Sequence, residues 1–253
     1  MKIYADYHTH TVYSHGSGQI EDNVRAALDC GLKQVGITDH GFKHTVFGLS
    51  EHYFREMRSE VERLKEIYPI EILLGVEANI TGMNGTIDVR DDQYEALDIV
   101  IAGYHKAAWP NRFSDIFSLH GSCLYKSIIG EPTPKMRAKC TEAYVKAIEK
   151  NPIDILSHPN YALGIEVEVV AEACASFGTY MELNGKRINM TGEEFERVLS
   201  TKVQFVANSD AHEPSRIAGL WRVEEFIRDF GDEVESRIVN LTAPIELRSR
   251  RGK

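Results

Sequence analysis

The stretch "IYADYHTHTVYSHG" (3–16) places His8, His10 and His15 directly behind the first apolar run of the chain. That run, "KIYADY" (2–7), has the short apolar character of a strand that is buried on both faces. Six further runs of this kind follow: "KQVGIT" (33–38), "IEILLGV" (70–76), "LDIVIAGY" (97–104), "IDILS" (153–157), "TYMEL" (179–183) and "VQFVAN" (203–208). We therefore predict seven strands.

Stretches with apolar residues at helical spacing separate most of these strands. They are "IEDNVRAALDCG" (20–31), "YFREMRSEVERLKEIY" (53–68), "KMRAKCTEAYVKAIEK" (135–150), "VEVVAEACASFG" (167–178) and "TGEEFERVLS" (191–200). A strand followed by a helix, repeated about seven times, is typical of a parallel (β/α) barrel. An open doubly wound sheet is the alternative, because periodicity does not report whether a sheet closes.

The length of 253 residues is common for an α/β barrel, so we expect one domain over residues 1–253. The segment 106–134 departs from the strand and helix alternation, since it holds Trp109 and three prolines around "FSDIFSLHGSCLYKSIIG". We interpret it as a long βα excursion with one helix, serving as a lid or pocket wall. The basic tail "RSRRGK" (248–253) is expected to be a frayed end.

Composition limits the classes of partner and the cellular compartment. The formal charge of -9 disfavours binding to long nucleic acid, which clustered Lys and Arg hold mainly through phosphates. Four widely spaced cysteines without a C-x-x-C pair indicate reduced thiols in a cytoplasmic protein. We find neither a secretory signal nor an apolar run of the roughly 18 residues that a membrane span needs.

Metal-binding side chains follow six of the seven predicted strands. They are His8 and His10 (first strand), His40 (second), Glu77 (third), His105 (fourth), His158 (fifth), and Asp210 and His212 (seventh). The carboxyl ends of parallel strands meet at one face of the fold, and residues i and i+2 of a strand point to the same side. His15 follows a short loop that can return to this face. The sequence therefore predicts a cluster of nine ligands.

A lone histidine after a strand is usually a hydrogen-bonded polar residue, but this joint pattern has no obvious packing reason. Nine ligands exceed the four or five that one zinc ion takes, so we predict two or three ions. Imidazole with carboxylate suits zinc, with manganese or iron as alternatives. We expect loop or surface roles for the histidines outside the pattern, His44, His52 and His120.

Such a centre would lower the pKa of a bound water toward neutrality and neutralise phosphate oxygens. Hydrolysis of a phosphoester is the leading chemistry. Amide hydrolysis or deamination at a barrel metal site is the competing one, because ligand spacing is compatible with both.

The motifs "HTHT" (8–11), "ITDHG" (37–41), "GVEANI" (75–80), "IAGYH" (101–105), "LSHP" (156–159) and "NSDAH" (208–212) resemble those of the PHP family, named for polymerase and histidinol phosphatase. They occur in family order along almost the whole chain. The resemblance implies a distorted seven-stranded (β/α), TIM-like barrel. The segment "GVEANITGMNGTID" followed by "LDIVIAGYHK" is most similar to the stand-alone YcdX-like phosphatases of that family.

The resemblance also implies three divalent metal ions in a trinuclear centre. It assigns one ion to His8, His10, Glu77 and Asp210, a second to His15, His40 and His212, and a third to Glu77, His105 and His158. All nine positions carry residues that can bind a metal.

Other roles follow from position in the sequence. Asp6 and Asp39 lie beside ligand histidines and are expected either to accept a ring N–H or to cap strand ends. Lys106 and Arg187 follow strands and are candidates for binding substrate phosphate, with a solvated loop position as the alternative. No side chain is assigned as the general acid, so the catalytic residue is left unknown.

We therefore predict a phosphatase that acts on a small phosphorylated metabolite. A histidinol phosphatase of histidine biosynthesis is the first alternative. A nuclease for short oligonucleotides and an accessory module of a replication assembly are the others.

Overall fold

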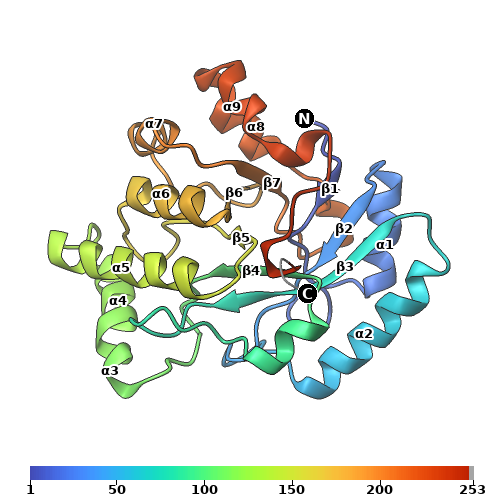
Figure 1. Cartoon of the computed structure of the whole chain (residues 1–253), viewed down its shortest axis with the longest axis horizontal. Helices are drawn as coiled ribbons and strands as arrows, with labels where there is room; N and C mark the ends of the chain where they lie inside the picture. Colours follow the sequence, from blue (N-terminus) through green and yellow to red (C-terminus); the bar gives the residue numbers. More distant parts are fainter. Residues whose placement is uncertain (251–253) are drawn as a thin grey trace.

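The structure, a computed structural model, describes residues 1–250. Seven parallel strands form one sheet in chain order, and the sheet curls into a barrel (Figure 1). The strands are β1 (Ala5–Asp6), β2 (Gln34–Ile37), β3 (Glu71–Asn79), β4 (Ile99–Gly103), β5 (Ile155–Leu156), β6 (Tyr180–Asn184) and β7 (Phe205–Asn208). The predicted seven-stranded (β/α) fold is confirmed, and the open doubly wound order is not found.

Helices cover the outer face of this sheet (Figure 1). They are α1 (Ile20–Asp29), α2 (Glu51–Lys65), α5 (Pro134–Lys150), α6 (Val167–Phe177), α7 (Gly192–Leu199), α8 (Trp221–Ile227) and α9 (Asp232–Ser236). In α2, Phe54, Met57, Val61 and Leu64 recur at helical spacing and are all buried. None of the helices within residues 1–250 is long and apolar enough to cross a membrane.

The segment 106–134 holds one continuous helix. It consists of α3 (Phe113–Asp115), a π-helical turn, η2 (Ile116–His120), and α4 (Gly121–Ile128). This helix packs on α5 through η2 and lies at the periphery of the molecule (Figure 1). The expectation of one helix in this segment is confirmed, whereas a lid role stays a prediction.

Strands β1 and β7 are not joined by a ladder of backbone hydrogen bonds within residues 1–250. The buried side chain of Asn240 spans this seam instead. Its Nδ2 donates to the carbonyls of Ala5 (2.8 Å) and Ala207 (2.7 Å), and its Oδ1 accepts from the Ala207 amide (2.9 Å). Nearer the carboxyl ends, a bridge between Thr9 and Ala211 brings the two chain segments together. The barrel is closed largely by side-chain bonds.

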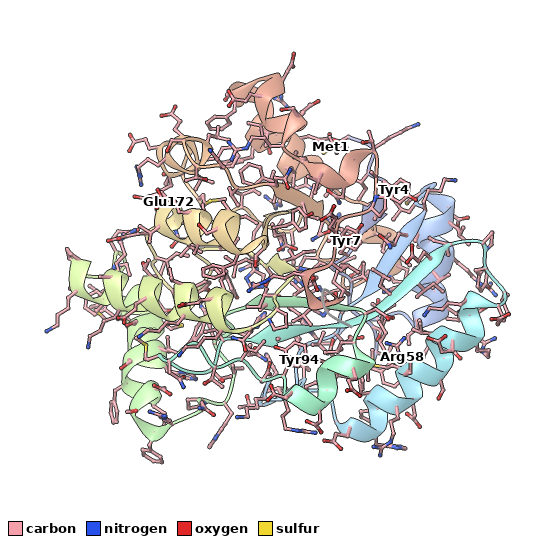
Figure 2. The ribbon with its side chains drawn as sticks, in the orientation of Figure 1. Met1, Tyr4, Tyr7, Arg58, Tyr94 and Glu172 are labelled. Carbon is pink, nitrogen blue, oxygen red and sulfur yellow. The ribbon has the colours of Figure 1, made fainter. Side chains whose placement is uncertain are left out.

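The C-terminal segment covers the amino ends of the strands. The Ile245 amide donates to the hydroxyl of Tyr7, which lies near the centre of the barrel (Figure 2). Arg248 donates to the Ile148 carbonyl (2.7 Å), and the Ser249 amide donates to Asp154 (2.8 Å). The expected frayed end is therefore wrong for residues 248 and 249, while 251–253 lie outside the described residues. The opposite end of the barrel carries the polar cluster described next.

Candidate metal centre

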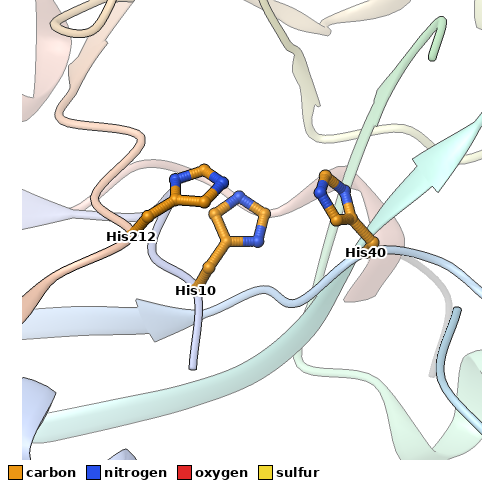
Figure 3. Close-up of side chains that lie close together, drawn as sticks. All are labelled: His10, His40 and His212. Carbon is orange, nitrogen blue, oxygen red and sulfur yellow. The ribbon is translucent and has the colours of Figure 1, made fainter. Parts of the chain in front are cut away.

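The nine predicted ligands meet at the carboxyl ends of the strands. His8 and His10 follow β1 on the same side of the chain, and His40, His105 and His158 follow β2, β4 and β5. Asp210 and His212 follow β7, and Glu77 lies inside β3. Figure 3 shows the rings of His10, His40 and His212 facing one another from separate segments of the chain. Seven of the nine are at least nine-tenths buried, and only His15 and His212 are more exposed.

Glu77 is the hub of the cluster, because its carboxylate is in contact with five of the histidines. Oε1 lies 2.7 Å from His158 Nε2, 3.2 Å from His105 Nε2 and 3.3 Å from His8 Nε2. Oε2 lies 3.0 Å from His40 Nδ1 and 3.6 Å from His10 Nε2. A single anion therefore links five side chains from four strand ends, which is the arrangement expected of a bridging carboxylate.

His8, His10 and Asp210 form one compact group of ligand atoms. The two Nε2 atoms lie 3.2 Å apart, and Asp210 Oδ1 lies 3.4 Å from His10 Nε2 and 3.8 Å from His8 Nε2. Ligands about 2.0–2.1 Å from a tetrahedral zinc ion lie ~3.4 Å from one another. These spacings therefore fit one ion between the three side chains.

His40 belongs to two neighbouring groups. Its Nε2 lies 3.1 Å from His15 Nδ1, and its ligand atoms group both with those of His10 and His212 and with those of Glu77 and His105. The ring of His15 lies 4.1 Å from that of His212, centroid to centroid. The structure brings all nine residues together, and it places His40 between two of the implied ligand sets.

His40 and His15 are neutral at physiological pH. Burial lowers the pKa of His40 to about 3, although Glu77 opposes it, and burial with the neighbouring His212 lowers the pKa of His15 to about 4. Their nitrogen lone pairs are therefore free to bind a cation. This condition is what a metal site requires of imidazole.

The carboxylates of the cluster are ionised. Burial alone would raise the pKa of Glu77 and Asp210, but the surrounding histidines outweigh it and hold both pKa values below their usual range. Burial would likewise lower the pKa of His8, whereas the charges of Glu77, Glu182 and Asp210 raise it. The site combines ionised carboxylates with the neutral imidazoles of His15 and His40, which suits a divalent cation.

Two buried side chains that sequence reasoning missed orient the ligand rings. Glu182 Oε1 lies 2.7 Å from His8 Nδ1, and Asn79 Oδ1 lies 2.7 Å from His105 Nδ1. In both rings the other nitrogen, Nε2, faces Glu77. The signal for Glu182 was present in the sequence, because it is a charged residue between Met181 and Leu183 in a strand that is otherwise apolar.

Asp6 and Asp39 cap backbone instead of accepting from ligand rings. Asp6 accepts from the amides of Ser209 (3.1 Å) and Ala218 (2.9 Å). Asp39 accepts from the Thr11 amide and hydroxyl (2.8 and 2.6 Å) and from Ser14. Of the two expectations for these acids, capping is the one that the structure shows. Asp39 therefore holds the loop that follows β1, and Asp6 holds the segment that follows β7.

A cavity of about 340 Å³ opens onto the cluster. Lys106 and Arg187, the two predicted phosphate-binding residues, both line it, and so does Lys186, which sequence reasoning missed. The Arg187 guanidinium lies over the Tyr161 ring at 4.8 Å, and Lys186 Nζ lies 3.1 Å from His212 Nδ1. The mouth of the site is therefore cationic, although the whole chain is acidic.

His44 was expected to be a surface or loop residue, and this is wrong in part. Its ring stacks on that of His40 at 4.8 Å and lines the same cavity. The expectation holds for His52, which is exposed on α2 beside Glu56. It is wrong for His120, which is half-buried in the helical turn η2 and bonds to the Ala108 carbonyl (2.8 Å). His44 was missed because its loop returns to the site through a bridge with Ala108.

Comparisons with known proteins agree with this geometry. Residues 6–190 match the model of the PHP domain. A "Probable phosphatase" of Shewanella baltica strain OS195 is 30% identical over 95% of this chain and 87% of its own length. A "Probable phosphatase" of Shewanella sp. strain MR-4 is 30% identical over 90% of this chain and 83% of its own length.

A solved structure has a similar fold. It is a histidinol phosphate phosphatase from Lactococcus lactis complexed with zinc, L-histidinol and phosphate, with a TM-score of 0.59 and 16% identity over 91% of this chain and 95% of its own. This likeness supports the barrel architecture described above.

The chain belongs to the PHP domain family, as its motifs indicated. Within that family it is a metal-dependent hydrolase of the phosphatase class, which confirms the leading chemistry over amide hydrolysis and deamination. The match to the family model ends at residue 190, so Asp210 and His212 lie beyond it. The structure nevertheless brings both residues to the cluster.

Proposed function

We propose that this protein hydrolyses a small phosphomonoester at a centre of three divalent ions. The observation that carries the proposal is the convergence of His8, His10, His15, His40, Glu77, His105, His158, Asp210 and His212. His8, His10 and Asp210 with Glu77 would hold one ion, His15, His40 and His212 a second, and Glu77, His105 and His158 a third. Zinc is the expected metal, with manganese or iron as alternatives.

Bound divalent ions supply Lewis acidity, which activates water and neutralises phosphate oxygens. The protein's own side chains do the positioning. Glu182 and Asn79 fix two ligand rings, and Lys106 and Arg187 hold phosphate oxygens from the cavity wall. No side chain is proposed as a general acid.

The cavity walls limit the class of substrate. A volume of about 340 Å³ suits a small metabolite and excludes a duplex. The carboxylates that line it, Glu77 and Asp210, both belong to the metal cluster. Beyond its phosphate, a substrate therefore meets cations and the rings of Phe47 and Tyr161. A neutral or anionic organic group fits these walls better than an amine.

Histidinol phosphate is the second candidate. The Lactococcus lactis protein of similar fold, whose structure holds L-histidinol and phosphate, favours it. The amine of histidinol would have to pair with Glu77 or Asp210, in competition with the ions. A cytoplasmic location is also proposed, and it is supported by four free cysteines within the described residues.

Specificity constants for phosphate release decide between these substrates. Histidinol phosphate is compared with sugar phosphates, nucleotides, a dinucleotide and an activated aryl phosphate. A preference for histidinol phosphate of several hundredfold, about 3–4 kcal/mol in transition-state binding, would assign that substrate. Comparable rates across the monoesters are the expected result for a broad phosphatase.

The metal centre is tested by His40→Ala and Asp210→Ala. Both variants are expected to lose bound metal and hydrolysis together. A folded, metal-free variant with unchanged turnover would refute the proposal. Cleavage of the dinucleotide alone would favour the nuclease alternative instead.

A further inference from the structure

The helix over residues 113–128 exposes an apolar stripe on its outer face. Phe113, Phe117, Leu124 and Ile128 follow one another at intervals of four, seven and four residues, so they lie on one side of the helix. Their exposed fractions are 84%, 79%, 60% and 70%, and the flanking Trp109 and Ile129 are each 65% exposed. We name these six residues the 113–128 stripe.

The opposite face of the same helix is packed against the barrel. Leu119 and Cys123 are buried there, and η2 contacts α5. Figure 1 shows α3 and α4 at the edge of the molecule, with α5 on their inner side. Contiguous apolar surface of this size is uncommon on monomers and marks an interaction surface.

The helical part of the stripe exposes no charged side chain, and the one charged residue within its span is the exposed Arg112, between Trp109 and Phe113. From Phe113 to Ile129 the exposed residues are Phe, Ser and aliphatic side chains, while Asp115 is buried. The one lysine of this helix, Lys126, turns inward and donates to the carbonyls of Asn160 (2.8 Å) and Leu163 (3.3 Å). Two copies of this acidic chain can therefore pack their stripes against each other without placing like charges face to face. A helix that binds membranes usually carries Lys and Arg beside its apolar face.

Gly121 lies near the middle of the stripe, and no close contact within the described residues requires a glycine at this position. A Cβ there would meet only the Ile116 carbonyl oxygen, at 3.9 Å. Glycine inside a helix costs about 0.5–1 kcal/mol relative to alanine. The open space above it allows the backbone of a second helix to approach closely.

We propose that a second copy of this chain packs on the 113–128 stripe, with the two helices related by a two-fold axis near Gly121. A two-fold axis pairs each stripe with itself. Three aromatic and three aliphatic side chains at these exposures offer roughly 800 Å² per copy, which is the area that one partner contributes to a standard interface. The proposal is independent of the activity proposed above.

The interface supports the loops that carry two of the metal-site histidines. From the inner face of the helix, His120 bonds to Tyr104 and Ala108, which flank His105. Lys126 holds the carbonyls of Asn160 and Leu163, in the loop after His158. A partner that covers the stripe would therefore stiffen the cavity wall from outside.

Sedimentation velocity of the metal-loaded protein at micromolar concentration tests the proposal. The wild type is expected to sediment as a dimer, and Phe117→Asp with Ile128→Asp as a monomer with an unchanged far-ultraviolet circular dichroism spectrum. Ile67→Asp is the matched control, because Ile67 is 54% exposed just beyond the end of α2. Helix α2 lies on the other flank of the barrel (Figure 1). This control variant should remain a dimer.

A wild-type monomer, or a dimer that persists in the double variant, would overturn the proposal. If the aspartates impair folding, Phe117→Ser with Ile128→Ser provides a milder pair with the same expected dissociation. Flotation with vesicles of phosphatidylcholine and phosphatidylglycerol is the second measurement. Binding of a monomeric wild type to these vesicles would assign the stripe to a lipid surface instead.

Discussion

Nδ1 of His8 lies 2.7 Å from Oε1 of Glu182, and Nε2 of the same ring faces Glu77 and Asp210. Glu182 is fully enclosed and also accepts from the His158 amide (2.8 Å) and from Asn208 (3.0 Å). Its position is therefore set by three neighbouring strand ends. A carboxylate in this position fixes the tautomer of the ring and makes Nε2 more basic.

Glu182→Gln is expected to weaken metal binding by about 10–100-fold, because the amide oxygen still accepts from the ring but no longer carries charge. Equilibrium dialysis against zinc, with the metal counted by mass spectrometry, measures the loss. Glu172→Gln on the exposed face of α6 is the control and should bind normally. Equal affinity of the two variants would show that Glu182 only supports the backbone.

Much of this site could be predicted, because parallel strands bring their carboxyl ends to one face. His8, His10, His105 and His158 each follow an apolar run directly, so a strand prediction also places the side chain. Glu182 and Asn79 escaped prediction because they lie inside strands, where alternation alone does not tell a residue that faces the site from one that faces the core. His44 and Lys186 depend on the path of a loop, which local sequence does not determine.

The closure of the barrel was also beyond prediction. Its seam is spanned by Asn240, which lies over 230 residues from Ala5 in the chain and has no periodic signal around it. The expectation of a frayed end failed for a related reason. A run of basic residues predicts a tail that is exposed to solvent. The Arg248 side chain instead donates a hydrogen bond to a backbone carbonyl of α5.

Glu77→Gln is expected to release more metal than His158→Gln. The two carboxylate oxygens of Glu77 face five histidines, so its charge would serve more than one ion. The Nε2 atom of His158 faces a single carboxylate, that of Glu77, so it would serve one ion. In the metal-free protein, loss of the buried charge of Glu77 should also cost ~3–5 kcal/mol of unfolding free energy. Metal content per chain and urea denaturation measure the two effects. Equal metal content in both variants would argue against a bridging carboxylate.

The metal-free protein should lose stability as the pH falls below the ordinary pKa of histidine. Burial lowers the pKa of His40 to about 3, so the unfolded chain binds a proton there that the folded chain does not. The contribution of neutral His40 to the free energy of unfolding is fully present above about pH 6.5. It is lost as the pH falls toward 3, at up to about 1.4 kcal/mol per pH unit. His40→Gln should therefore show a shallower decline. Urea denaturation in EDTA at about pH 7, 6 and 5 gives both slopes, and parallel slopes would contradict the expectation.

Asn240→Ala should destabilise the fold without removing the metal cluster. The substitution leaves the Ala207 amide and the carbonyls of Ala5 and Ala207 without their partner, at about 1–3 kcal/mol for each group left unsatisfied. We expect a loss of ~3–5 kcal/mol in urea denaturation, with normal turnover at low temperature. Asn111→Ala, at an exposed asparagine, should change stability little. A small loss for Asn240→Ala would mean that backbone contacts, such as the bridge from Thr9 to Ala211, close the barrel unaided.

Arg187→Lys separates the charge of this side chain from its shape. The guanidinium lies 4.8 Å from the centre of the Tyr161 ring, and both residues line the cavity. Lysine keeps the charge but loses both the contact with the ring and the paired donors. If Arg187 holds substrate phosphate before and during the reaction alike, KM should rise about tenfold, ~1.4 kcal/mol of binding, while kcat changes little. Arg197→Lys, on α7 beside Glu168, is the control. A fall in kcat at constant KM would instead mean that Arg187 acts on the phosphoryl group only as it is transferred, and unchanged kinetics would leave phosphate binding to Lys106 and Lys186.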